Sequence, residues 1–395
     1  MFTALENKIE ILFPPKGFVW DDFTSRKLLP AFAPEVLSFL DDLSKALLND
    51  PRLVAFPDLT AMGFWLRGAH IKKMAAEYEG RLLIARGTVF HLAPGNVDTI
   101  FVYSLVLGLL AGNRNIVRLG KRETPQQQVL LDILSGALQN HPVIADRLLL
   151  VRYGHDDEIT GFFSANCNVR VIWGGDASVN AIRKLPLPPG SSELAFSGRF
   201  SLAVLQGGDF TEREIAGFVT DCFSFGQQGC SSPKLIVWLN TADDEKETFW
   251  SALESEWIKR RFTLSPAEAM SRWNDANDAA MQAAGPVQLK RPVGKKAFLR
   301  VQIKSWSDLK RELNHGNGLF YELDSASLED VLKHCEESDQ TVVTMGINSE
   351  MWREAVLDAP PKGIARIVPA GKALEFSHIW DGHDLIAEMS RRIAL

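Results

Sequence analysis

The sequence has few cysteines, no hydrophobic run long enough for a membrane helix, and no excess of basic residues. Its four cysteines form no C-x-x-C pair, which argues against a zinc ribbon or a thioredoxin-like site. Its histidines fit no H-E-x-x-H or similar ligand spacing, so we expect no metal. A formal net charge of −6 argues against a nucleic-acid partner, because nucleic-acid binders are usually basic.

The longest uncharged apolar run covers residues 99–113 and has 15 residues, which is too short to cross a bilayer comfortably. The first residues, MFTALENKIEILFPPKG, lack the order of a signal peptide, in which an apolar stretch follows basic residues. So few cysteines in so long a chain suit a reducing compartment. We therefore expect no membrane insertion and a cytoplasmic location.

The sequence does contain short apolar strands that alternate with helices from residue 82 onward. Two helices, at 34–48 and 59–79, are expected before that point. Strands are expected at 82–93, 114–119, 147–153 and 169–175, and helices at 98–111, 124–139, 156–165 and 177–185. This order predicts a parallel sheet with helices on both faces, and such sheets commonly bind nucleotides beyond the carboxyl ends of their strands.

A chain of 395 residues is long enough for two domains. The proline-rich segment 185–192 interrupts the alternation and is predicted to lead out of the first domain. A second α/β region follows. Its strands are expected at 201–205, 234–239, 295–304, 318–323 and 340–347, and its helices at 211–224, 306–313, 325–336 and within 242–284.

One candidate for chemistry is Cys230, in the stretch DCFSFGQQGCSSPKL (221–235). Gly226 and Gly229 allow tight backbone geometry around it, and the following Ser-Ser-Pro stops a helix from continuing. A cysteine at such a junction could act as a nucleophile, with its own N–H holding an oxyanion. The alternative is a small buried apolar residue, which describes most free cysteines.

Further candidates lie where the predicted strands of the first half end. Asn96, in HLAPGNVDT, could cap the next helix or donate its amide N–H to a developing negative oxygen. Gly174 and Gly175, in WGGD, could let a phosphate approach a helix N-terminus or could form an ordinary turn.

A basic group, Arg118, Lys121 and Arg122, ends the strand in VRLGKRE. Such a group could grip the ribose phosphate of a dinucleotide, or it could be a solvated loop. A 2′-phosphate requires charged partners, and no acid precedes Glu123 here. The group therefore favours NADPH, with NADH as the alternative.

Four longer segments, at 87–119, 171–205, 223–234 and 363–386, together resemble the LuxC-type acyl-CoA reductases, the fatty acid reductases of the aldehyde dehydrogenase superfamily. The resemblance runs in matching order over roughly residues 82–395. It implies an α/β, aldehyde dehydrogenase-like fold with a Rossmann-like cofactor-binding domain and an α/β catalytic domain. The expected division is 1–81 as the N-terminal helical part of the cofactor domain, 82–200 as the dinucleotide-binding domain, 201–375 as the catalytic domain and 376–395 as a C-terminal tail.

The resemblance also implies roles for individual residues. The superfamily's catalytic cysteine follows a motif like F-x-x-G-Q-x-x-C, which FSFGQQGC matches at Cys230. Its oxyanion-stabilising asparagine matches Asn96, and the basic residue at its adenosine ribose matches Arg118. The remaining residues that the resemblance places at the cofactor are Pro94, Gly95, Gly120, Lys121, Trp173, Gly174, Gly175 and Phe196.

The segment LAFSG departs from the superfamily's L-E-L-G-G motif, because Ala195 stands where the glutamate that activates water is expected. Glu193 lies two residues earlier, a displacement of about 7 Å on a strand. Asp176 also departs, since an acid at this position repels a pyrophosphate unless it caps the helix. Without the glutamate, water attack on an acyl-enzyme should be slow, as the reduction of a thioester to an aldehyde requires.

The expected substrate is therefore an acyl-CoA or another acyl thioester, supplied directly or by an acyl-transferring or acyl-activating partner enzyme. Oligomers are usual in the superfamily, so a homo-oligomer is also expected. Two alternatives remain open at this point. One is an aldehyde dehydrogenase working in the oxidative direction, and the other is a cysteine acyltransferase or thioesterase that uses no nicotinamide.

Overall fold

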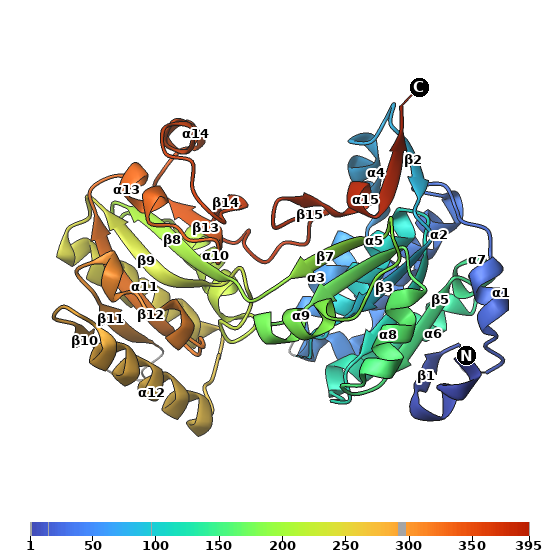
Figure 1. Ribbon diagram of the computed structural model, residues 1–395. Coiled ribbons are helices and arrows are strands. Elements are labelled where there is room, and N and C mark those ends of the chain that lie inside the picture. The colour runs from blue at the N-terminus through green and yellow to red at the C-terminus, as the bar shows by residue number, and fades with distance from the viewer. Residues whose placement is uncertain (1, 15, 96, 291–297, 395) are drawn as a thin grey trace. The chain divides into compact units, whose positions relative to one another are not determined.

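The computed structural model describes residues 2–14, 16–95, 97–290 and 298–394, and the chain forms two compact units. Unit 1 comprises Met1–Gly198 and Phe376–Leu395, and unit 2 comprises Arg199–Glu375 (Figure 1). Unit 1 therefore contains the candidate cofactor residues, and unit 2 contains Cys230.

Unit 1 is built on a six-stranded sheet with the order β1-β5-β4-β3-β6-β7. The bounds are β1 Glu10–Phe13, β3 Thr88–Leu92, β4 Arg114–Leu119, β5 Leu148–Arg152, β6 Val169–Trp173 and β7 Ser192–Phe196. Only the edge pair formed by β1 and β5 is antiparallel among these neighbours. Every residue of β3, β5 and β6 is buried, as expected for parallel strands covered on both faces.

Helices cover both faces of this sheet, as predicted. Their bounds are α1 Trp20–Ser25, α2 Pro34–Asn49, α3 Pro57–Trp65, α4 Gly68–Ala76, α5 Ile100–Leu110, α6 Pro125–Leu138, α7 Pro142–Ala145, α8 Asp157–Ala165, α9 Asp176–Arg183 and α15 Leu385–Glu388, with 3₁₀ helices η1 Phe2–Ala4, η2 Glu6–Lys8 and η3 Pro51–Ala55. Successive residues of β3 point to opposite faces. Phe90 packs on Phe163 of α8, whereas His91 bonds to Ser104 of α5.

Two elements that were expected to be continuous are broken. The helix expected at 59–79 is two helices, α3 and α4, because Arg67 between them has an extended ψ of 137°. The strand expected at 82–93 is divided at Gly87, where φ is 142°. A Cβ at Gly87 would lie 2.0 Å from Oδ1 of Asn168, so the turn requires glycine.

The segment before this break joins a separate sheet of two strands. β2 (Leu82–Ala85) pairs antiparallel with β17 (Ser390–Ile393). The rest of the 376–395 segment also packs within unit 1: a second small sheet joins β15 (Ile379–Trp380) to β16 (His383–Asp384), and Met389 is fully buried. The Asn113 side chain donates to the carbonyl of Met389 at 2.9 Å.

The proline-rich segment 185–192 does not lead out of the first domain, contrary to expectation. It returns the chain to the same sheet, because β7 directly follows it and pairs parallel with β6. The two units divide between Gly198 and Arg199, after β7. The prolines mark a long connection between adjacent strands, which composition alone does not distinguish from a linker.

Unit 2 contains a seven-stranded sheet with the order β10-β11-β12-β9-β8-β13-β14. The bounds are β8 Phe200–Gln206, β9 Pro233–Leu239, β10 Gln288–Lys290, β11 Leu299–Gln302, β12 Leu319–Ser325, β13 Asp339–Met345 and β14 Arg366–Pro369. β10 is antiparallel to β11, and the other neighbours are parallel.

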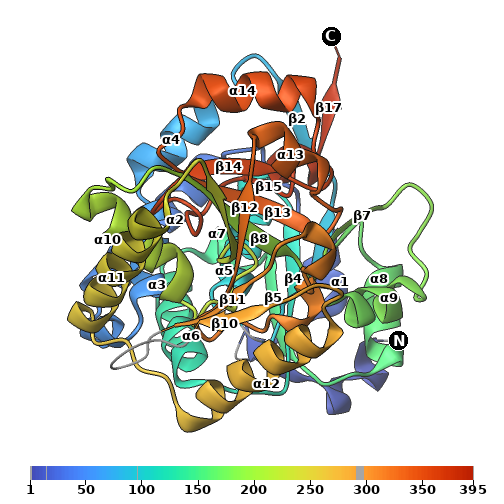
Figure 2. The same cartoon turned by 90° about the vertical axis from the view of Figure 1, so that its left-hand side faces the viewer.

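The helices of unit 2 form two layers over this sheet. Their bounds are α10 Glu212–Phe223, α11 Asp243–Lys259, α12 Pro266–Gln282, α13 Leu328–Lys333 and α14 Ser349–Asp358, with 3₁₀ helices η4 Trp306–Asp308 and η5 Arg311–Leu313. Along β9, Ile236 and Trp238 pack with α10 and α11, which lie side by side in Figure 2. The alternate residues Leu235 and Val237 pack with α12, α13 and α14. The second region is thus α/β as predicted, although the helix expected at 306–313 is two short 3₁₀ turns.

Candidate functional site

Cys230 lies in the turn between α10 and β9, at the amino-terminal edge of the sheet in unit 2. It is partly exposed, whereas the flanking Gly229 and Ser231 are buried. The hydroxyl of Ser201, on the neighbouring strand β8, donates to the carbonyl of Cys230 at 2.7 Å. The backbone at the cysteine is therefore held by the adjacent strand, and the residue as a whole is partly exposed.

The buried side chain of Gln227 stabilises the cysteine turn by hydrogen bonds. Gln227 is fully buried and has a φ of 62°. Its Nε2 donates to the carbonyls of Pro233 at 2.8 Å and Leu319 at 3.0 Å. Its Oε1 accepts from the N–H of Gly318 at 2.9 Å. One side chain thus joins the cysteine turn, the start of β9 and the start of β12.

The loop at 314–318 packs directly against the cysteine turn. The N–H of Asn317 donates to the carbonyl of Gly226 at 3.0 Å. Gly316 has a φ of 89°, and a Cβ there would lie 2.7 Å from the carbonyl oxygen of Gln227. Backbone contact of this kind leaves little freedom for either loop.

The two serines that follow Cys230 support the turn. Ser231 donates to the side-chain oxygen of Gln340 at 3.3 Å, and Ser232 donates to the carbonyl of Asp221 at 2.7 Å. The Cys230 Sγ lies 3.9 Å from the Ser231 Oγ. Both hydroxyls are thus used in packing the turn.

The other three cysteines differ from Cys230 in being buried. Burial raises the pKa of Cys167 and of Cys335 to about 12, and it raises the pKa of Cys222 well above its ordinary value. All three therefore remain thiols at neutral pH and are poor nucleophiles. Among the four, the cysteine predicted from sequence is the one that is not buried.

Asp221, on α10 beside the cysteine turn, is a buried carboxyl group. It accepts the backbone N–H groups of Gly371 at 2.6 Å and Ala373 at 3.0 Å. Burial raises the pKa of Asp221 to about 7, and these hydrogen bonds oppose the shift only in part. The carboxyl group therefore titrates near neutral pH in the folded protein.

We expect Asp221 to make unit 2 less stable as the pH rises. Because its folded pKa is above its ordinary value of 3.8, its contribution is fully present below pH 3.8 and is lost as the pH rises through about 7. The full difference between these two pKa values corresponds to about 4 kcal/mol, and the part of it lost between pH 5 and pH 8 is about 2–3 kcal/mol. Urea unfolding at pH 5 and pH 8 should show a larger fall for the wild type than for Asp221→Asn. Equal falls would contradict the prediction.

In unit 1, the candidate cofactor residues gather at the carboxyl edge of the sheet. Trp173, the last residue of β6, stacks on Phe196, the last residue of β7, with ring centroids 4.1 Å apart. The N–H of Gly174 donates to the carbonyl of Phe196 at 3.1 Å. The structure thus brings together three of the residues that the resemblance implied.

A buried polar chain fixes the Trp173 indole. Its Nε1 donates to Ser104 at 3.0 Å, Ser104 lies 2.7 Å from Nδ1 of His91, and His91 Nε2 lies 3.0 Å from Oδ1 of Asn115. Burial lowers the pKa of His91 to about 4, so the ring is neutral. Gly108 is needed on α5, because a Cβ there would lie 2.1 Å from Oδ1 of Asn115.

The glycine turn after β6 leads into α9, which begins at Asp176 with Gly175 as its N-cap. A Cβ at Gly175 would meet no atom within 4 Å, so this helix start is open. Asp176 lies in the first turn, where a negative charge suits the helix dipole but opposes a bound phosphate. Residues Gly174 and Gly175 are therefore placed as the phosphate hypothesis requires, and Asp176 remains a departure.

The side chain of Arg118, near the end of β4, bonds to neighbouring backbone groups of the protein. Its guanidinium donates to the carbonyls of Tyr153 at 3.0 Å and Gly154 at 3.1 Å, and it lies over the Tyr153 ring. Burial lowers its pKa, and no carboxylate among the described residues pairs with it. Its Nε is buried without a partner. The positive charge of this guanidinium is therefore available to pair with a bound anion.

Lys121 and Arg122 follow in the loop after β4, and both are exposed. Within the described part of the chain, neither forms an ion pair. The aliphatic stem of Lys121 lies over Gly154, where a Cβ would be 2.8 Å from its Cε. A Cβ at Gly120 would meet no atom within 4 Å. Lys121 and Arg118 thus both contact Gly154.

The turn between β3 and α5 is described only in part. Pro94 is half-buried and Gly95 is exposed, and the proposed oxyanion residue Asn96 lies outside the described residues. The N-cap of α5 is Thr99, which makes no side-chain capping bond. The Thr124 hydroxyl donates to the Asp98 carboxylate and joins this turn to the loop after β4.

Comparison with known families identifies the chain. Residues 65–392 match the family described as Acyl-CoA reductase (LuxC). The chain belongs to this family. A curated relative, the long-chain acyl-protein thioester reductase of Aliivibrio fischeri, is 24% identical over 173 residues, which make up 43% of this chain. The match spans 35% of that relative, so the chain covers about a third of its length.

Solved structures show that the fold of this LuxC-family chain is aldehyde dehydrogenase-like. Methylmalonate-semialdehyde dehydrogenase from Oceanimonas doudoroffii aligns with a TM-score of 0.70 and 11% identity, over 93% of this chain and 86% of that one. Aldehyde dehydrogenase 21 from Physcomitrella patens aligns with a TM-score of 0.65 and 10% identity, over 94% and 86%. The family and the fold predicted from sequence are therefore confirmed.

On β7 of the LuxC-family chain, Ala195 stands where the family resemblance led us to expect a glutamate base. Ala195 lies on β7 and packs against the apolar core of unit 1. Glu193 is held by two arginines, with Arg170 at 2.5 Å and Arg183 at 2.8 Å. An acid bound in this way is not available to activate water.

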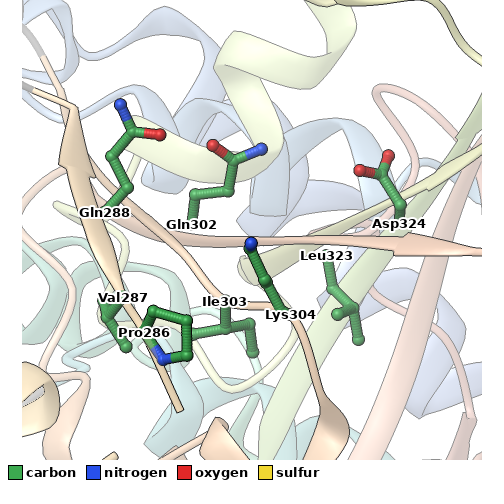
Figure 3. Close-up of a pocket in the computed structure, with 8 residues that line it drawn as sticks. All are labelled: Pro286, Val287, Gln288, Gln302, Ile303, Lys304, Leu323 and Asp324. Carbon is green, nitrogen blue, oxygen red and sulfur yellow. The ribbon is translucent and has the colours of Figure 1, made fainter.

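One cavity of about 480 Å³ lies elsewhere in unit 2, beside the carboxyl ends of β11 and β12 (Figure 3). Its apolar lining is Pro286, Val287, Ile303 and Leu323, and its polar lining is Gln288, Gln302, Lys304 and Asp324. Cys230 lies at the amino-terminal edge of the same sheet, so this cavity is not part of the cysteine site. Nothing in the sequence indicated it.

Among the described residues, no group of three or more histidine, cysteine, aspartate or glutamate side chains is arranged to hold a metal ion. No helix in the described ranges is long and apolar enough to cross a membrane.

Proposed function

We propose that this protein reduces an acyl thioester of the acyl-CoA type to the aldehyde through an acyl group carried on Cys230. The observation that carries the proposal is the match of residues 65–392 to the acyl-CoA reductases. The position of Cys230 supports it, because the other three cysteines are buried and raised in pKa, while Cys230 lies partly exposed on a fixed turn.

The first step is transfer of the acyl group to the enzyme. The Cys230 thiolate attacks the thioester carbonyl, a bond forms between Sγ and the acyl carbon, and the bond to the coenzyme A sulfur breaks. Coenzyme A leaves as a thiolate and takes a proton from solvent. The exchange of one thioester for another is nearly neutral in energy. We assign the oxyanion to the Asn96 amide and the Cys230 N–H, as the family resemblance implies.

The carboxyl edge of unit 1 fits a nicotinamide dinucleotide. Gly174 and Gly175 leave the start of α9 open to a pyrophosphate, and the Arg118 guanidinium has no carboxylate partner among the described residues. Pro94, Gly95, Gly120, Trp173 and Phe196 complete the proposed cofactor site. A nicotinamide bound there would supply the hydride that reduces the Cys230 thioester to an aldehyde.

The absence of a base protects the intermediate. Ala195 carries no acid, and Glu193 is bound to Arg170 and Arg183. Water near the acyl group therefore meets no activating carboxylate on this strand. The acyl group should remain on Cys230 until it is reduced, which favours a reductase over a thioesterase.

We propose NADPH as the cofactor, because Lys121 and Arg122 are exposed cations at the end of β4. Each should form a charge-assisted bond with a 2′-phosphate. The double variant Lys121→Ala/Arg122→Ala should raise KM for NADPH by about 10- to 100-fold, which corresponds to 1.4–2.8 kcal/mol, and leave KM for NADH within about threefold. Steady-state kinetics with both cofactors measure this. An equal rise for NADH would contradict the assignment of the two cations to the 2′-phosphate.

The proposed function is tested by incubating the protein with NADPH and acyl-CoAs of increasing chain length. Loss of NADPH absorbance, one aldehyde trapped per NADPH consumed, and release of coenzyme A are expected. Thioester turnover without loss of NADPH would instead indicate an acyltransferase or a thioesterase. If no acyl-CoA consumes NADPH or NADH, the proposal fails.

A further inference from the structure

Lys234 lies four residues after Cys230, as the second residue of β9, and it is half-buried. Its Nζ donates to the carbonyl of Asn314 at 3.0 Å. The Asn314 side chain in turn donates to the carbonyl of Lys234 at 3.3 Å. The two ends of this lysine are therefore held by one residue of the loop at 314–318.

The backbone between Cys230 and Lys234 is anchored at both ends and between them. Ser201 holds the carbonyl of Cys230, Gln227 holds the carbonyl of Pro233, and Asn314 holds the carbonyl of Lys234. These anchors come from three different parts of unit 2. The cysteine and the lysine thus keep a fixed separation, rather than moving independently on a flexible loop.

Few charges face the lysine. Burial lowers the pKa of Lys234, and negative charge at Cys230 and, less strongly, at Asp275 on α12 opposes that shift. The Asp275 carboxylate is already bonded to the ring and backbone N–H of His315, at 3.1 Å and 3.2 Å. Arg272, also on α12, is directed to the carbonyl of Asn317 at 3.4 Å.

The Lys234 ammonium thus has a neutral carbonyl as its bonded partner. Within the described residues, no carboxylate forms an ion pair with it. A half-buried ammonium is costly unless an opposite charge is close. The thiolate of Cys230 is the group on the same anchored turn that can provide that charge.

We propose that the Lys234 ammonium stabilises the thiolate of Cys230 and so makes the cysteine reactive at neutral pH. The inference rests on the proposed role of Cys230 and adds the group that activates it. Lys234 acts through Cys230, so it is a positioning residue. Sequence reasoning missed it because a lysine at the start of a strand has no distinctive motif, and its partner Asn314 lies 80 residues away.

The test is the pH dependence of Cys230 alkylation by iodoacetamide in the full-length protein, followed by peptide mass spectrometry. Lys234→Gln removes the charge and keeps a donor for Asn314, and Lys234→Met removes both. Both should move the midpoint of the alkylation profile up by about one pH unit and slow alkylation at pH 7 about tenfold. Lys234→Arg should keep the wild-type midpoint, as should the control Lys304→Met, which removes an exposed lysine of unit 2.

Two measurements show whether a Lys234 variant is partly unfolded or has altered access to Cys230. Labelling of the buried Cys222 reports unfolding, and the rate well above both midpoints reports access to Cys230. An unchanged midpoint in a folded Lys234→Gln variant would overturn the inference, as would an equal shift in Lys304→Met. A shifted midpoint in a protein that reduces no acyl-CoA would support the inference and refute the proposed function, so the two failures are distinguishable.

Discussion

Cys230→Ala is expected to abolish thioester reduction, with kcat lowered by at least about 10⁴-fold, because the variant has no atom to carry the acyl group. When the wild type is incubated with acyl-CoA and no reduced nicotinamide, it should gain the mass of one acyl group. The variant should gain none. The folded structure should change little, since Cys230 is partly exposed and removal of its sulfur leaves no large cavity.

Cys222→Ala is the matched control for this experiment. Cys222 lies on α10, eight residues before Cys230, and it is fully buried with a raised pKa. Its removal should cost about 1–2 kcal/mol of unfolding free energy and leave acylation intact. If Cys230→Ala retains acylation, or if Cys222→Ala loses it while folded, the assignment of the nucleophile is wrong.

The second large effect is expected from Gln227→Ala. The substitution leaves the carbonyl of Pro233 and the N–H of Gly318 without their partner in a buried site, while the carbonyl of Leu319 keeps its bond from the Asn314 side chain. Each group left without a partner costs about 1–3 kcal/mol, so we expect a loss of about 2–5 kcal/mol in unfolding free energy. Because the same bonds hold the cysteine turn, acylation of Cys230 should also slow in the fraction that remains folded.

The neighbouring glutamine provides the control. Gln228 is exposed, and its amide makes one long contact, 3.5 Å from the Asn317 side chain. Gln228→Ala should therefore change the unfolding free energy by less than about 0.5 kcal/mol. Urea denaturation of both variants measures the difference. Similar losses for the two variants would show that Gln227 does not anchor the turn.

Much of the fold could be predicted because it follows from local periodicity. The alternation of apolar strands and helices correctly indicated the parallel sheet, and the long apolar stretch at 99–113 correctly indicated a buried helix, α5. What could not be predicted depends on distant partners. The break at Gly87 is imposed by Asn168, and the role of segment 185–192 depends on the pairing of β7 with β6.

In the candidate site, too, some residues could be predicted from local sequence, and others depend on distant partners. The F-x-x-G-Q-x-x-C pattern led to Cys230, and the family resemblance led to Trp173 and Phe196. Within GQQG, however, the two glutamines cannot be told apart by sequence, although one is the buried anchor of the turn and the other is exposed. Arg118 was expected at the cofactor, and its bonds to the carbonyls of Tyr153 and Gly154 depend on the end of β5, over thirty residues later.

The division of the chain has a consequence for the order of folding during synthesis. Unit 2 is one continuous segment, whereas unit 1 needs residues 376–395 to complete it, through the pairing of β17 with β2 and the burial of Met389. Domains usually fold from the N-terminus as they leave the ribosome. Here a segment made after unit 2 completes the unit that begins before it, so unit 2 can be folded before β2 has its partner strand.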